Sequence, residues 1–174
     1  MWWSRRSLLL ALAAPLAGCG FTPALAPGAP AAGLQGRIRA DDPPDRDAAE
    51  FLTRLEERLG RPTAPGWTLA YRLEVTETRL GLEAGIGETR GQMVGNVVWA
   101  LTPEGAPDTR PGDPVARGQS RQFAGFSRTA TPLANRAAAE DARRRLARML
   151  ADAVVAELTA TASRWAGSMN GLGP

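Results

Sequence analysis

The hydrophobic period of the chain changes twice, and this change restricts the fold more than any other feature of the sequence. Apolar residues recur at helical spacing over residues 48–59, and over 67–75 they occupy every second position. Helical spacing returns after Pro132, in a run without Gly or Pro that extends to Gly167. Strand side chains alternate between two faces, whereas helical side chains return to one face every third or fourth residue. The pattern therefore predicts strands between two amphipathic helices.

Six segments are predicted to form regular structure, in the order strand, helix, three strands, helix. They are residues 34–40, 47–59, 67–76, 93–101, 115–126 and 132–162. Two amphipathic helices on one face of a sheet bury both apolar stripes together. The predicted fold class is therefore α+β, with two helices packed on one face of a mostly antiparallel four-stranded sheet (β-α-β-β-β-α).

Local signals refine these boundaries. Asp47 and Glu50 have the spacing of a capping box, which places the start of the first helix at Asp47. Three glycines in 81–87 interrupt the strand alternation and indicate either a bulge or a long hairpin connection. The many polar residues of 115–126 predict an edge strand, and the Pro-rich stretch 103–114 predicts a surface loop.

The N-terminus has the layout of an export signal. A charged start with Arg5 and Arg6 precedes an apolar run over 8–18, which has 11 residues and is too short to cross a bilayer as a helix. The tetrad Leu16-Ala17-Gly18-Cys19 resembles the bacterial lipobox, in which the Cys receives a diacylglycerol. A buried free Cys behind an apolar run is the structural alternative. The arginine pair fits both an ordinary and a twin-arginine signal.

These features divide the chain into four parts. Residues 1–18 are expected to form a lipoprotein signal peptide, and Cys19 is the expected lipidation site. Residues 19–33 are rich in Ala, Pro and Gly and predict a lipidated flexible tether. Residues 34–162 are expected to form one domain, and 163–174 a disordered tail.

The composition excludes several kinds of chemistry. All 21 basic residues are Arg, His is absent, and Cys19 is the only Cys, so His-based catalysis, His metal ligands and an internal disulfide are excluded. The pI near 10.3 suggests nucleic-acid binding. Removal of residues 1–18 takes away Arg5 and Arg6 and leaves 19 Arg against 18 acidic residues. The charge of the mature chain therefore no longer supports nucleic-acid binding. We expect no nucleic-acid partner, no metal and no cofactor.

Four arginines on neighbouring predicted strands are candidates for one anion-binding surface, because guanidinium groups bind phosphate in a bidentate manner. They are Arg90, Arg117, Arg121 and Arg128. Cross-strand pairing with acidic residues explains them equally well. Phe123 and Phe126, at the end of the same strand, are interpreted either as core residues or as an apolar contact surface for a partner.

A catalytic centre is not expected. Glu74, Glu77, Glu83 and Glu88 lie near one hairpin, where a hydrolase would need two facing carboxylates with separated pKa values. Strand alternation distributes them between two faces and a turn, which favours solvated charges. Arg143, Arg144, Arg145 and Arg148 are interpreted as a solvated helix face beside Glu140, Asp141 and Asp152.

The whole pattern resembles a family, the lipopolysaccharide-assembly lipoprotein LptE of the alphaproteobacterial type. The resemblance rests on the segment from Leu16 to Pro23, on Thr89-Arg90 before the strand that contains Trp99, and on the helix from Leu133 to Asp152. It implies an α/β sandwich that plugs the periplasmic side of the LptD β-barrel, assists its assembly and binds lipopolysaccharide. The sequence departs from the family in having no Lys and in its Pro-rich loop at 103–114.

The resemblance also implies a location and site roles. Gly20 follows Cys19 where inner-membrane lipoproteins carry Asp, so the outer membrane, at its periplasmic face, is the expected location. The four candidate arginines would contact lipopolysaccharide, and the two phenylalanines would contact a partner. Two alternatives remain: a stand-alone periplasmic ligand-binding lipoprotein, and a carboxylate-dependent hydrolase of the cell envelope.

Overall fold

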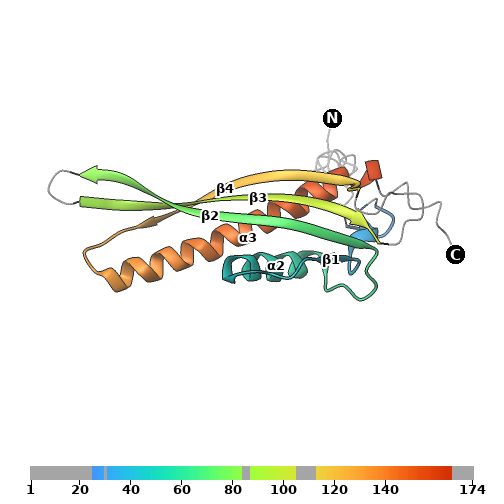
Figure 1. Ribbon diagram of the computed structural model, residues 1–174, viewed down its shortest axis with the longest axis horizontal. Helices are drawn as coiled ribbons and strands as arrows, with labels where there is room; N and C mark the ends of the chain where they lie inside the picture. Colours follow the sequence, from blue (N-terminus) through green and yellow to red (C-terminus); the bar gives the residue numbers. More distant parts are fainter. Residues whose placement is uncertain (1–24, 30, 84–86, 105–112, 166–174) are drawn as a thin grey trace, which may run out of the picture.

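The protein is a two-layer sandwich in which one layer is a sheet and the other is a pair of helices (Figure 1). The computed structural model describes residues 25–29, 31–83, 87–104 and 113–165. The predicted signal peptide, Cys19 and the residues after Trp165 lie outside the described residues. The elements in chain order are η1 (Ala32–Leu34), β1 (Ile38–Ala40), α2 (Arg46–Leu59), β2 (Trp67–Glu83), β3 (Gly87–Pro103), β4 (Ala116–Ser127) and α3 (Pro132–Trp165). This confirms the predicted fold class.

The strands lie in the sheet in the same order as in the chain, β1-β2-β3-β4. β1 and β2 are parallel, so α2 serves as the crossover between them, and the other pairs are antiparallel. One register extends from the pair Trp67–Pro103 to the pair Glu83–Gly87. This constant register means that β2 and β3 form one long hairpin without a bulge. β4 is an edge strand, as the sequence predicts.

The core lies between the sheet and the helices. Alternate residues of β2 and β3 meet an apolar stripe of α3, and α2 covers the β1 side. The largest fully buried side chains are Leu34, Phe51, Leu55, Leu59, Leu69, Met93, Val97, Leu101, Leu146, Leu150, Val154 and Leu158. Within the described residues, neither helix has the combination of length and apolarity that a membrane crossing requires.

The first helix begins earlier than the capping-box pattern predicts. Asp45 is the N-cap, and its Oδ1 accepts a hydrogen bond from the backbone N–H of Ala48 at 2.8 Å. Asp47 lies in the first turn, where its carboxylate forms an ion pair with Arg143 at 3.0 Å. The predicted capping role of Asp47 is therefore wrong. Asp45, in an extended conformation after two prolines, already accepts a hydrogen bond from a free N–H group of the first turn.

The segment before α2 differs from the single strand predicted over 34–40. Gly36 adopts a φ of +66° between η1 and the short β1, and its N–H donates to the carbonyl oxygen of Leu59 at 2.7 Å. This turn interrupts the predicted strand. Ala31 is buried and Leu25 packs against the core, so folded structure begins before residue 34.

The last helix extends three residues beyond the predicted end at 162. Trp165 is buried, and its indole lies edge-on to that of Trp67 with ring centroids 4.9 Å apart. The indole N–H also donates to Oγ1 of Thr161 at 3.1 Å. These contacts hold the last turn of α3 against the start of β2.

Candidate functional site

The face of the sheet that carries no helix is the candidate functional surface, and we call it the open face. Both helices lie on the other face (Figure 1). Side chains alternate along a strand, so the register brings Thr76, Val94 and Phe123 into one row across β2, β3 and β4. Glu74, Asn96 and Arg121 form the next row. The open face is thus mainly polar, with a few apolar side chains among the charges.

The two candidate phenylalanines lie on opposite faces of the sheet. Phe123 is 64% exposed on the open face. Phe126 is only 8% exposed, because its ring lies directly over Gly91, where no side chain occupies the space. Phe126 is therefore a core residue, and only Phe123 is available to a partner or ligand.

The four candidate arginines are also divided between the two faces of the sheet. Arg90, Arg117 and Arg121 are exposed at open-face positions of β3 and β4. Arg128 lies just after β4 and forms an ion pair with Glu77 at 2.8 Å. Glu77 pairs across β2 and β3 with the buried Met93, which places this ion pair on the helix-bearing face. The structure therefore brings three of the four arginines onto one surface.

Two shallow hollows lie on the open face, and Phe123 lines the second of them. A hollow of about 440 Å³ is lined by Glu74, Thr76, Thr78, Val94, Asn96, Gln119 and Arg121. A hollow of about 390 Å³ is lined by Arg90, Gly91, Gln92, Phe123, Gly125, Phe126 and Ser127. Guanidinium groups beside an exposed aromatic ring suit an amphipathic anion, because the same ligand can meet charge and apolar surface together.

The basic run of α3 is largely paired. Arg143 pairs with Asp47, Arg148 with Glu50, and Arg145 with Asp141. Two of these pairs join α3 to α2. Asp152, which the sequence places beside this run, instead pairs with Arg54 and Arg58 of α2. The run thus helps to hold the helices together and is not a free anion-binding patch.

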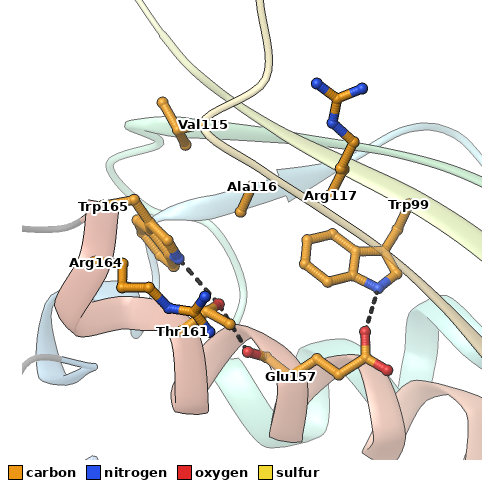
Figure 2. A pocket seen from close by; sticks show the side chains of 8 residues that line it. All are labelled: Trp99, Val115, Ala116, Arg117, Glu157, Thr161, Arg164 and Trp165. Atoms are coloured by element: carbon orange, nitrogen blue, oxygen red, sulfur yellow. Dashed lines mark hydrogen bonds between the residues drawn. The ribbon is translucent and has the colours of Figure 1, made fainter.

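A polar cluster that the sequence analysis missed lies at the other end of α3 (Figure 2). Oε2 of Glu157 accepts a hydrogen bond from the indole N–H of Trp99 at 2.9 Å, and Oε1 accepts one from the hydroxyl of the buried Ser120. This carboxylate ties α3 to both β3 and β4. The one sequence feature that indicates this cluster is the position of Glu157 within the apolar stripe of the helix.

No arrangement of catalytic groups is found among the described residues. Glu74 and Glu77 lie on opposite faces of the sheet, and the side chains of Glu83 and Glu88 lie outside the described part. Burial, followed by the charges of Asp41, Asp45 and Asp42, raises the pKa of Tyr71 to about 12, so this phenol is no base at neutral pH. The described residues also contain no cluster of metal-ligating side chains.

Replacing Glu74 or Glu77 with Gln, one at a time, is expected to leave the cellular function intact. Among the side chains that the structure describes, neither carboxylate faces a second acid, so neither has the arrangement that acid–base catalysis needs. Complementation of a deletion strain measures this. Loss of complementation by one variant with an unchanged circular dichroism spectrum would restore the hydrolase alternative.

The fold is shared with solved lipoproteins, although no protein-family model and no curated protein matches the chain significantly. A predicted lipoprotein from Caulobacter crescentus has 22% identity, and the match covers 77% of this chain and 96% of that one with a TM-score of 0.60. Rare lipoprotein B from Shewanella oneidensis has 13% identity, 74% and 96% coverage and a TM-score of 0.55. Lipoprotein B from Nitrosomonas europaea has 10% identity, 73% and 84% coverage and a TM-score of 0.55. At these identities the likeness is one of fold.

Proposed function

We propose that the chain is an outer-membrane lipoprotein of the LptE type, which plugs and helps to assemble the LptD β-barrel and assists lipopolysaccharide delivery. Residues 1–18 are removed on export, and the lipid on Cys19 holds the domain at the periplasmic face of the outer membrane. The observation that carries the proposal is that a lipobox precedes a domain whose fold is shared with solved lipoproteins.

The shape of the domain supports a plugging role. The sheet extends well beyond α2 along its long axis and leaves one face uncovered (Figure 1). On that face Val98 and Phe123 are 46% and 64% exposed among polar side chains. Such a mixed surface is suited to contact with the polar inner wall of a large barrel.

Isolation of the tagged full chain from membranes is expected to copurify a large β-barrel protein. Cys19→Ser should abolish labelling by radioactive fatty acid and release the protein from the membrane, because several acyl chains supply the anchorage. Ser7→Ala, in the signal segment, is the matched control and should leave labelling unchanged. Labelling without a copurifying barrel protein would favour the stand-alone lipoprotein, and continued membrane labelling of Cys19→Ser would refute the anchor.

The open face is our proposed lipopolysaccharide-binding surface. Lipopolysaccharide presents phosphates beside acyl chains. On this face Arg90 and Arg121 lie near the exposed Phe123, and Arg117 lies farther along β4. Exposed guanidinium groups give up part of their hydration on binding, and the strong charge-assisted bonds that they form with phosphate offset this cost. Arg128 lies on the other face and is not part of this surface.

The double substitution Arg90→Glu/Arg121→Glu is expected to weaken lipopolysaccharide binding by roughly tenfold or more, because two charge-assisted hydrogen bonds are lost. The barrel complex should still form. Arg136→Glu/Arg144→Glu, on the outside of α3, is the control and should change binding much less. Binding is measured with fluorescent lipopolysaccharide, and equal losses in the two double variants would mean that only the bulk charge matters.

A further inference from the structure

A third hollow, of about 300 Å³, lies between the end of α3 and the start of β4 (Figure 2). Its lining comprises two indoles, one carboxylate, the side chain of Arg164 and a few small side chains, and Arg117 lies at the rim with its guanidinium group directed outward. The residues are Trp99, Val115, Ala116, Arg117, Glu157, Thr161, Arg164 and Trp165. The two indoles are nearly buried and form apolar walls, while charged groups of both signs reach the same space.

The carboxylate of Glu157 has unused acceptor capacity toward this hollow. A carboxylate offers about four acceptor positions. Trp99 and Ser120 occupy one position on each oxygen. The remaining positions can accept hydrogen bonds from a ligand, and a primary ammonium group supplies both the donors and the complementary charge.

The two guanidinium groups at this hollow are available for an anion. Arg117 and Arg164 are exposed, and neither forms an ion pair with the residues that the structure describes. Figure 2 shows the guanidinium group of Arg117 pointing outward at the rim. A headgroup that carries a phosphate and a primary ammonium therefore finds complementary charge for both of its groups.

The length of the chain before the described residues places a membrane close to this hollow. η1 and the start of β1 lie at the same end of the molecule as the end of α3 (Figure 1). Ile38 pairs with Trp67, and Trp67 contacts Trp165. Cys19 precedes the core-packed Leu25 by six residues. Six residues span at most about 20 Å, so a lipid on Cys19 keeps this end of the domain within that distance of the headgroups.

We propose that this hollow binds the headgroup of a phosphatidylethanolamine molecule of the membrane in which the chain is anchored. Arg117 and Arg164 bind the phosphate, Glu157 accepts from the ammonium, and the indoles of Trp99 and Trp165 contact the glycerol and the first methylenes. This inference rests on the proposed lipidation of Cys19. It concerns the end of the domain, and Arg117, on the edge strand β4, is the one residue that it shares with the open face.

Weak intrinsic affinity is enough for occupancy at this site. A short tether turns headgroup binding into an intramolecular event with an effective concentration on the order of millimolar. Tryptophan is also favoured at the membrane interface, where its ring is partly apolar and its N–H is polar. The anchor and the hollow would together hold the domain with this end toward the membrane.

The test uses tryptophan fluorescence of the lipidated mature protein in vesicles. After loss of Trp2 and Trp3 with the signal peptide, the remaining tryptophans are Trp99 and Trp165, which line the hollow, and Trp67, which contacts Trp165. Two sets of vesicles have the same mixture of phosphatidylethanolamine and phosphatidylcholine. Bromines, which quench tryptophan, are placed on the upper acyl chain of phosphatidylethanolamine in one set and of phosphatidylcholine in the other.

Quenching is expected to be several-fold stronger when phosphatidylethanolamine is brominated, because a quaternary choline cannot donate hydrogen bonds to Glu157. Arg117→Glu/Arg164→Glu should remove the difference. Arg46→Glu/Arg136→Glu, exposed at the starts of α2 and α3, is the matched control and should retain it. Circular dichroism checks that each variant is folded.

Two kinds of outcome separate this inference from the proposed function, and a third refutes both. Equal quenching in the two vesicle sets, or an unchanged difference in Arg117→Glu/Arg164→Glu, overturns the headgroup site even where the barrel protein copurifies. Stronger quenching by brominated phosphatidylethanolamine, without copurification of a barrel protein, supports the headgroup site and refutes the plugging role. An N-terminal peptide without acyl chains on Cys19, detected by mass spectrometry, refutes both.

Discussion

Gly95→Val is expected to lower the free energy of unfolding by about 3 kcal/mol, because it overpacks a close approach between β3 and α3. A Cβ at Gly95 would lie 2.7 Å from Cδ1 of Leu150 and 3.0 Å from Cδ2 of Leu146. Both leucines are fully buried, so neither has free space into which to move. The two further methyl groups of valine increase the overlap.

Gly125→Val is the matched control for this effect. A Cβ at Gly125, on the neighbouring strand, meets nothing within 4 Å, so its valine should change the free energy of unfolding by less than about 0.5 kcal/mol. Urea titration followed by circular dichroism measures both variants. Similar stabilities would mean that α3 moves away from the sheet at little cost.

Glu157→Ala is expected to cost about 3 kcal/mol or more, because it leaves two buried donors without an acceptor. The indole N–H of Trp99 and the hydroxyl of Ser120 both donate to this carboxylate. Its removal also takes away the polar link that joins α3 to β3 and β4. Glu140→Ala, at an exposed position of the same helix, should be nearly neutral.

A double-mutant cycle separates the hydrogen bond from other effects of the Glu157 substitution. Ser120→Ala removes one donor, so the combined variant should cost clearly less than the sum of the two single variants. Strict additivity would contradict a direct interaction between the two side chains. The free energies of unfolding come from the same urea titrations.

The fold was predictable because each long element has one hydrophobic period. The alternation from Trp67 to Val75 corresponds to the first part of β2, which continues to Glu83 beyond the predicted strand. The apolar stripe corresponds to the buried face of α3. The short segment before α2 was not predictable in the same way. Its conformation depends on the turn at Gly36 and on a hydrogen bond to Leu59, which is distant in sequence.

The candidate site was only partly predictable, because a residue belongs to it only if its side chain points to the open face of the sheet. Phe123 and Phe126 are three residues apart, so strand alternation sends them to opposite faces. The same parity separates Arg128 from Arg121. The contacts of Glu157 span 37 residues to Ser120 and 58 to Trp99, and no local pattern encodes such distances.

The order of the strands has a consequence for the time course of folding. Each strand pairs with its predecessor, so the hairpins can close as soon as their residues are available. The second half of the core, however, comes from α3, the last element. A chain that is made or exported from its N-terminus therefore holds the apolar faces of β2 and β3 in water until residues 132–165 arrive. In that interval the nascent sheet is the form most exposed to aggregation and to proteases, so a chaperone would act on it before α3 is complete.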